Sequence, residues 1–180
     1  MDTKEKVISV FDSIAAEGSW EGLYRNKLSR WNYNFIARAR AVQEMLSGRI
    51  QSSVLDIGCG SGDLAPFFIE KDASYIGIDL SQQMIERAQK IYSGLIETKK
   101  ASFRVADCEQ LPFEDEDFEL VIAVAVIEYL SDPTRALDEI MRVTKSGGLA
   151  LLTVPYRQCV NYYIRALLSG LFFRNLENYL

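Results

Sequence analysis

Three alternating glycines, and an aspartate that follows them at the end of the next apolar segment, are the residues that most clearly indicate chemistry. The segment Val54-Leu-Asp-Ile runs directly into Gly58, Gly60 and Gly62. Glycine lets the backbone turn sharply and lets a ligand approach the main chain with no Cβ in the way. Asp79 lies 21 residues after Gly58, where a carboxylate can accept hydrogen bonds from both hydroxyls of a ribose. The pattern therefore predicts a ligand that carries a nucleoside.

The spacing of the glycines indicates which nucleoside ligand to expect. Folds that bind dinucleotides use G-x-G-x-x-G and place the pyrophosphate at a helix N-terminus. Here the spacing is G-x-G-x-G, and the next residue, Asp63, puts a negative charge where a pyrophosphate would lie. Repulsion between like charges argues against NAD or FAD. The glycines alone also leave open a turn that binds no ligand.

Asp56-Ile-Gly-Cys-Gly-Ser-Gly62 resembles, position by position, the first motif of the class I S-adenosylmethionine-dependent methyltransferases, an acid followed by G-x-G-x-G. Later segments resemble the same family in the same order, within about residues 50 to 155. They are Phe103-Arg-Val-Ala-Asp-Cys108, Leu111-Pro-Phe with Asp117-Phe-Glu-Leu-Val-Ile122, and Arg142-Val-Thr-Lys-Ser-Gly-Gly148, where Ser146 replaces the usual proline. The branch it is most similar to is that of small-molecule enzymes of the quinone-biosynthesis type.

The resemblance implies a Rossmann-like fold and S-adenosylmethionine as the cofactor. The candidate cofactor-binding residues are Asp56, Gly58, Cys59, Gly60, Asp79, Leu80, Met84, Asp107, Cys108 and Val124.

Each of these residues has an expected role by the same resemblance. Asp79 would bind the ribose, and Asp107 with the Cys108 backbone would bind the adenine. Gly58 and Gly60 would contact the methionine end of the cofactor. Asp56 would order the glycine loop and approach the cofactor amino group. Leu80 and Met84 would flank the adenine, with core packing as the other interpretation of Met84.

Val126-Ile-Glu128-Tyr129-Leu-Ser-Asp-Pro133 resembles the L-E-H-x-x-D-P segment of quinone-type O-methyltransferases and makes Glu128 the candidate catalytic base. Tyr129 stands where those enzymes have a histidine, and Ala125 stands where they have a further acid. No metal site is therefore expected. Glu128 could instead bind a helix end or face the cofactor.

Composition favours one globular domain, because 180 residues suffice for a single full core. The net charge is −5, and residues 51–154 carry 9 basic and 18 acidic side chains, so a nucleic-acid partner is disfavoured. There is no histidine, which excludes histidine base catalysis and makes a zinc site unexpected. Three scattered cysteines and a charged N-terminal segment predict a cytoplasmic protein with no transmembrane segment.

Strand and helix signals alternate through the middle of the chain and predict an α/β fold, a doubly wound, mostly parallel sheet with helices on both faces. Ser81 is the expected N-cap of a helix over 82–91. Asp132 is the expected N-cap of a second helix that begins at Pro133 and ends before Gly147. The expected strands are 53–56, 75–79, 102–105, 120–124 and 149–154. Asp56, Asp79, Asp107 and Val124 then fall at the carboxyl ends of strands, where such sheets bind ligands.

The segments on either side are expected to be helical. Residues 1–50 are rich in aromatic residues and either pack on the sheet or form a lid, from which Arg30 or Arg38 could meet the cofactor carboxylate. Residues 51–155 form the cofactor-binding core. Residues 156–180 are expected to form a helical segment, and the family's C-terminal hairpin does not follow, so either the chain is truncated or this member lacks the last strands. The helical segment could cover the sheet edge, mediate a homodimer or another partner contact, or touch a membrane surface.

The sequence thus predicts a cytoplasmic methyltransferase that acts on a small-molecule acceptor. Two other classes stay open: a non-catalytic regulatory domain that binds S-adenosylmethionine, and an NAD-dependent oxidoreductase.

Overall fold

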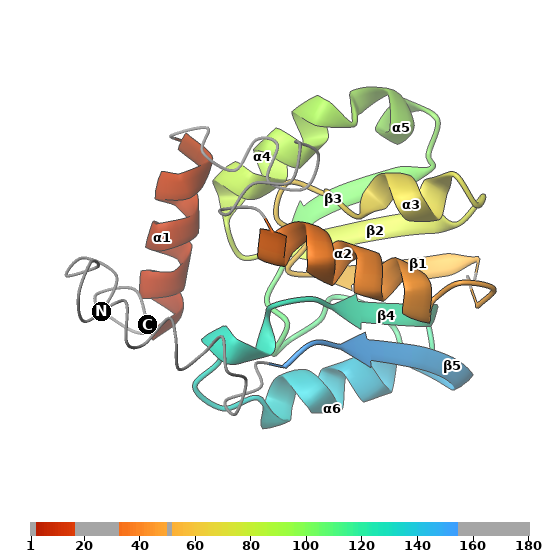
Figure 1. The fold of residues 1–180 in the computed structure, drawn as a ribbon. Coiled ribbons are helices and arrows are strands. Elements are labelled where there is room, and N and C mark those ends of the chain that lie inside the picture. Colours follow the sequence, from red (N-terminus) through yellow and green to blue (C-terminus); the bar gives the residue numbers. More distant parts are fainter. Residues whose placement is uncertain (1–2, 17–32, 50–51, 155–180) are drawn as a thin grey trace.

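The computed structural model describes residues 3–16, 33–49 and 52–154. Its centre is a sheet of five parallel strands in the order β3-β2-β1-β4-β5 (Figure 1). The strands are β1 (Ser53–Ile57), β2 (Ser74–Asp79), β3 (Ala101–Val105), β4 (Phe118–Ala123) and β5 (Thr144–Leu152). The predicted parallel α/β sheet is confirmed.

Helices join the strands and cover both faces of the sheet. They are α1 (Thr3–Ala16), α2 (Tyr33–Met45), α3 (Ala65–Ile69), α4 (Gln82–Ile91), α5 (Ser93–Glu97) and α6 (Thr134–Val143), with a short 3-10 turn, η1 (Ile127–Tyr129), after β4. Side chains of α2, α3 and α4, such as Val42, Phe68 and Ile85, pack on one face of the sheet. On the other face, Ile140 of α6 packs against Leu55 and Val121. The strands lie between these two layers and are therefore almost wholly apolar.

Ser81 begins α4 as predicted, because its hydroxyl accepts a hydrogen bond from the Met84 amide at 3.1 Å. Asp132 accepts one from the Thr134 amide at 2.9 Å, and the backbone of Pro133 is already helical.

The predicted end of the last helix at Gly147 is wrong. Helix α6 ends at Val143, and β5 begins at once at Thr144, five residues before the expected start. Gly147 lies inside β5 with a φ of +80°, near a shift in register between β4 and β5. A glycine with positive φ at such a point is typical of a β-bulge, which allows a polar segment to continue the strand.

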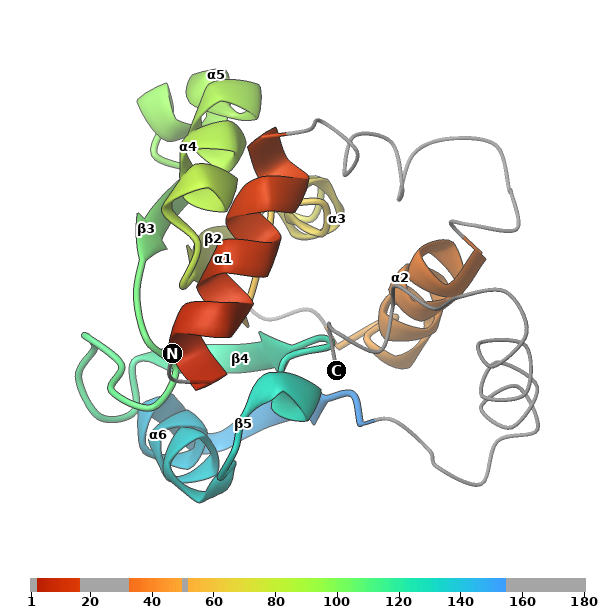
Figure 2. The same ribbon diagram turned by 90° about the vertical axis from the view of Figure 1, so that its left-hand side faces the viewer.

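Helix α1 does not belong to either layer and lies across the carboxyl ends of the strands (Figures 1 and 2). It packs against α4. The carboxyl ends of β1 and β4 form the switch point of the sheet, since the chain order reverses there. Helix α1 therefore covers the edge of the sheet at which this fold class binds ligands. Among the described residues, no helix combines the length and the apolar character that crossing a membrane requires.

Candidate functional site

The glycine loop after β1 is tied to the end of β2. The Cys59 amide donates to the Ile78 carbonyl at 2.9 Å, and the Gly60 amide donates to one carboxylate oxygen of Asp79 at 2.9 Å. The other oxygen of Asp79 accepts the Ser81 amide at 2.9 Å. The Leu80 amide also acts on this carboxylate, and since a carboxylate offers about four acceptor positions, its capacity is not exhausted by these backbone donors. The glycine motif and Asp79, which are separate in the sequence, are therefore joined by hydrogen bonds in the structure.

Asp56 lies at the end of β1 with only 2% of its surface exposed, where it accepts a hydrogen bond from the Tyr75 hydroxyl. Burial, opposed by this bond and reinforced by the charges of Asp79 and Asp63, raises the pKa of Asp56 to about 7. The pKa of Asp79 is also raised, chiefly by burial. Tyr75 was not among the predicted site residues, because a tyrosine in an apolar strand is typical of core packing.

Two of the glycines give room to protein side chains. Gly58 and Gly62 have φ values of +68° and +79°. A Cβ on Gly58 would lie 2.4 Å from Cγ2 of Val126, in the turn after β4. A Cβ on Gly62 would lie 2.7 Å from the Phe103 ring. The turn after β4 therefore packs against the first glycine, and Val126 fills the space that the absence of a Cβ leaves there.

Asp107 follows β3 and contacts helix α1. Its Oδ1 accepts the Glu109 amide at 2.9 Å, and its Oδ2 accepts the Lys4 ammonium at 2.6 Å. Lys4 also pairs with Glu109 at 2.8 Å. The pKa of Lys4 is raised by these two acids, whose effects outweigh its desolvation by burial. The residue expected to bind the adenine is thus linked to the helix over the site.

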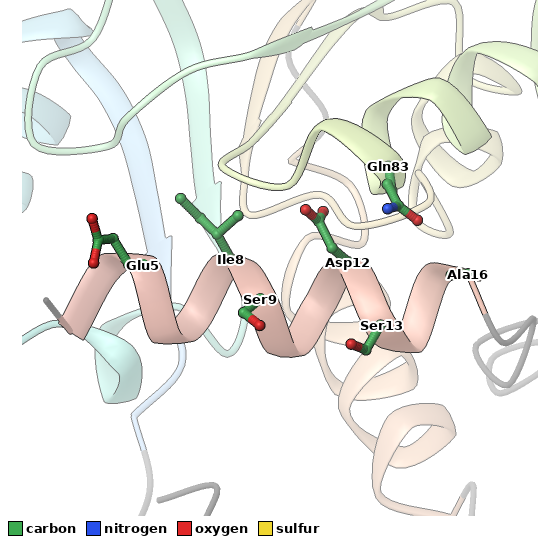
Figure 3. Close-up of a pocket in the computed structure, with 7 residues that line it drawn as sticks. All are labelled: Glu5, Ile8, Ser9, Asp12, Ser13, Ala16 and Gln83. Atoms are coloured by element: carbon green, nitrogen blue, oxygen red, sulfur yellow. The ribbon is translucent and has the colours of Figure 1, made fainter. Parts of the chain in front are cut away.

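Two further polar contacts fix α1. The Ser81 hydroxyl donates to Asp12, and Arg87 of α4 donates to the Ala15 carbonyl at 2.8 Å. Beside Asp12, α1 and the start of α4 border a shallow groove of about 490 Å³, seen in Figure 3. Its lining residues are Glu5, Ile8, Ser9, Asp12, Ser13, Ala16 and Gln83. None of the predicted cofactor-binding residues lines this groove, so it is separate from the glycine loop.

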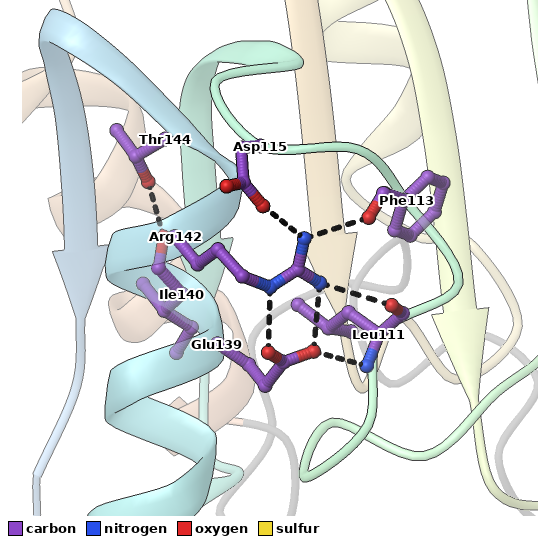
Figure 4. Close-up of polar contacts among 7 residues, drawn as sticks. All are labelled: Leu111, Phe113, Asp115, Glu139, Ile140, Arg142 and Thr144. Atoms are coloured by element: carbon purple, nitrogen blue, oxygen red, sulfur yellow. Dashed lines mark hydrogen bonds and ion pairs between the residues drawn. The ribbon is translucent and has the colours of Figure 1, made fainter.

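An arginine of α6 fixes the loop that follows the Asp107 segment (Figure 4). Arg142 donates to the carbonyls of Leu111 and Phe113 at 3.1 and 2.8 Å, and to Glu139 and Asp115. Glu139 in turn accepts the Leu111 amide at 2.6 Å. These bonds hold the segment between β3 and β4 on the surface of α6. The motif around Leu111 therefore has a structural explanation that its sequence alone did not provide.

The remaining predicted site residues differ in how deeply they are buried. Cys59, Cys108 and Val124 are buried, and burial raises the pKa of Cys108 to about 11. Met84 is fully buried, which agrees with core packing, whereas Leu80 is half-buried at the tip of β2. Glu128 is exposed in η1. Arg38 is half-buried on α2, and Arg30 lies outside the described residues. The roles of all these residues in binding stay predictions.

The site is negatively charged. The pKa of Asp56 is raised in part by the negative charges of Asp79 and Asp63, which lie close to it. Such a cluster favours a cationic ligand and opposes a pyrophosphate. Among the described residues, no group of three cysteine, aspartate or glutamate side chains is arranged to hold a metal ion.

A five-stranded parallel sheet with a glycine loop after β1 and an acid at the end of β2 defines a nucleoside-binding α/β domain. Residues 55–152 match the family model described as "Methyltransferase domain", which is more than half of the chain. The chain belongs to this methyltransferase domain family.

Individual relatives agree with this assignment. The chain is 37% identical over 118 residues to an O-methyltransferase of Pyrenophora dematioidea, covering 63% of this chain and 44% of that protein. It is 30% identical to the demethylmenaquinone methyltransferase of Chlorobaculum tepidum, over 69% of this chain and 49% of that protein. It is 36% identical to tocopherol O-methyltransferase of Arabidopsis thaliana, over 55% of this chain and 29% of that protein. The chain spans less than half the length of these curated relatives.

Solved structures share the fold. The YcgJ protein of Bacillus subtilis superposes with a TM-score of 0.60 at 25% identity, covering 74% of this chain and 58% of that one. The cyclase SpnF superposes with a TM-score of 0.65 at 24% identity, covering 83% and 60%. The name of the second structure is not that of a methyltransferase, so the fold by itself does not fix the reaction.

The contacts of Lys4 lead to a prediction about helix α1. Replacing Lys4 with methionine removes its pairs with Asp107 and Glu109. Since partly exposed ion pairs contribute about 0–1 kcal/mol, we expect amide hydrogen exchange in α1 to rise by a few-fold. Lys6→Met is the matched control, because Lys6 is exposed on the same helix. Equal exchange in the two variants would show that Lys4 does not hold α1 in place.

Proposed function

We propose that this protein is an S-adenosylmethionine-dependent methyltransferase that acts on a small-molecule acceptor. The observation that carries the proposal is the position of Asp79. This carboxylate fixes the glycine loop through the Gly60 amide and retains acceptor capacity at the tip of β2. Membership of the methyltransferase domain family supports it.

The residues present suit this cofactor. S-adenosylmethionine carries a ribose, an adenine, and an amino-acid end with a sulfonium and an ammonium group. The remaining acceptor capacity of Asp79 suits ribose hydroxyls, and the charges of Asp63 and Asp79, which also raise the pKa of Asp56, suit a ligand with positive charges. Gly60 has a φ of +53° and leaves its backbone uncovered by a Cβ. The same negative charge opposes NAD, which weakens the oxidoreductase alternative.

When bound, the cofactor supplies an electrophilic methyl group, and the intrinsic reactivity is its own. The protein must align the acceptor with that group, and such alignment can supply on the order of 7–11 kcal/mol of the barrier. Asp79 and Asp107 would hold the nucleoside, and Gly58 and Gly60 the amino-acid end. Helix α1, bound through Lys4 and Asp12, would act as a lid that excludes water.

Glu128 is the proposed general base if the acceptor requires one. It is exposed in the turn that follows β4. Strand β4 lies on one side of β1, and β2, which ends at Asp79, lies on the other. The acceptor itself is proposed to be an oxygen nucleophile, since two of the three relatives named above are O-methyltransferases. A cytoplasmic location, and self-association through residues 156–180, which lie outside the described part of the chain, are further proposals.

Calorimetry and a transfer assay together test the proposal. We expect S-adenosylhomocysteine to bind and NADH not to bind. Methyl-labelled S-adenosylmethionine should then pass its label to metabolites of a deproteinised cell extract. Binding without transfer would favour the alternative of a regulatory domain, and tight binding of NADH alone would overturn the assignment.

A further inference from the structure

Asp107 lies beside Asp79 at the carboxyl edge of the sheet, and its carboxylate is fixed by its own backbone. Val105, the last residue of β3, pairs with Asp79, and the Ala106 amide donates to the Asp79 carbonyl at 3.1 Å. The Oδ1 atom of Asp107 accepts the Glu109 amide at 2.9 Å, so the local turn holds that oxygen. A base attached to a ribose on Asp79 would therefore meet Asp107 mainly through Oδ2.

The ammonium group of Lys4, in the first turn of α1, occupies that oxygen. It lies 2.6 Å from Oδ2 of Asp107 and 2.8 Å from a carboxylate oxygen of Glu109, so it bridges the two acids. All three side chains are half-buried. The amino group of adenine is a neutral donor, whereas an ammonium adds the attraction of opposite charges to its hydrogen bond. Lys4 therefore competes with an adenine for Asp107.

Glu109 gives the ammonium of Lys4 a second place to bind. When the ammonium leaves Asp107, it can keep its contact with Glu109. The helix also stays attached at its other end, where Asp12 and Ala15 accept hydrogen bonds from the N-cap and from an arginine of α4. Release of Asp107 therefore does not require α1 to leave the ends of the strands.

We propose that Lys4 is an inhibitory latch of the nucleoside site, which holds Asp107 against the 6-amino group of adenine and passes to Glu109 alone when the cofactor binds. This rests on the proposed function, in which Asp107 binds the adenine, and extends it to the regulation of that site. The latch is an ion pair, so dissolved salt screens it. A rise in ionic strength therefore favours binding of the cofactor by releasing Asp107.

The test compares the affinities for S-adenosylhomocysteine and S-inosylhomocysteine, in which a carbonyl oxygen replaces the 6-amino group. Lys4→Met should tighten binding of S-adenosylhomocysteine by about two- to fivefold, the range that a partly exposed ion pair supplies. It should not tighten binding of S-inosylhomocysteine, whose 6-oxygen cannot donate to Asp107. Lys4→Arg keeps the charge and should resemble the wild type. Lys6→Met is the matched control, because Lys6 is exposed on the same helix.

Two further measurements test the ion pair and the transfer to Glu109. Added salt should tighten binding of S-adenosylhomocysteine to the wild type and leave Lys4→Met unchanged, since only the wild type has a pair to screen. Glu109→Gln removes the second place for the ammonium and should weaken binding of S-adenosylhomocysteine. An affinity in Glu109→Gln equal to that of the wild type would overturn the transfer.

The outcomes separate the latch from the proposed function. If the wild type binds S-adenosylhomocysteine and Lys4→Met binds it equally or more weakly, the latch alone is overturned. Equal tightening of both ligands by Lys4→Met, or the same tightening in Lys6→Met, would also overturn it, because the effect would not then arise at the 6-amino group. Failure of both the wild type and Lys4→Met to bind S-adenosylhomocysteine would overturn the proposed function, and the latch with it.

Discussion

Replacing Asp79 with alanine is expected to abolish most of the affinity for S-adenosylhomocysteine while leaving the protein folded. The variant loses a charged acceptor for two ribose hydroxyls, and it also frees the Gly60 amide that orders the loop. Two hydrogen bonds to a charged group, at about 1.5–3 kcal/mol each, correspond to a loss of about 100-fold or more. Titration calorimetry measures this loss directly.

Two companion variants make the result specific. Asp79→Asn keeps the shape and one acceptor oxygen, so we expect an intermediate affinity. Asp117→Ala removes an exposed acid from the loop before β4 and should leave the affinity unchanged. Circular dichroism of all three variants checks the fold. An Asp79→Ala protein that binds S-adenosylhomocysteine as tightly as the wild type would remove the ribose assignment.

The second large effect concerns stability and Asp56. Its pKa is about 7 in the folded protein and 3.8 as an ordinary side chain. Between these values the folded state holds a proton that the unfolded state has lost, so the free energy of unfolding falls as the pH rises through this window. Above the folded pKa the effect is complete. The shift corresponds to roughly 4 kcal/mol at most.

Asp56→Asn should remove this dependence. The amide oxygen can still accept the Tyr75 hydroxyl, but the side chain never ionises. In urea denaturation at a series of pH values, we expect the variant to equal the wild type below the ordinary pKa of 3.8, to gain on it as the pH rises through the window, and to exceed it most above the folded pKa of about 7. Asp138→Asn, an exposed change on α6, is the control. Parallel curves for wild type and Asp56→Asn would mean that Asp56 is not buried as a protonated acid.

The parts of the site that the sequence could predict are those in which residue type and spacing follow a recognisable motif. The glycine loop, the acid at the end of β2 and the Ser81 cap are of this kind. Their spacing constrains the backbone directly, so the parallel sheet and the end of β2 were predictable.

Contacts between distant segments could not be predicted. Lys4 and Asp107 are 103 residues apart in the chain, and although Asp107 was a predicted site residue, nothing in the sequence pairs it with Lys4. The early start of β5 was missed because its first residues are polar. Edge pairing depends on backbone hydrogen bonds rather than on apolar side chains, and the pairing of Thr144 with Phe118 needs no hydrophobic residue at position 144.

The polar contacts of α1 with later parts of the chain determine when this helix can take its place as the polypeptide emerges from the ribosome. Its partners, Ser81, Arg87 and Asp107, are synthesised long after the helix itself. Because chains fold as their segments become available, α1 must wait undocked until β3 and the acid beyond it have been translated. Docking of α1 over the carboxyl ends of the strands is therefore a late event in biogenesis, completed only after the sheet edge beneath it has formed.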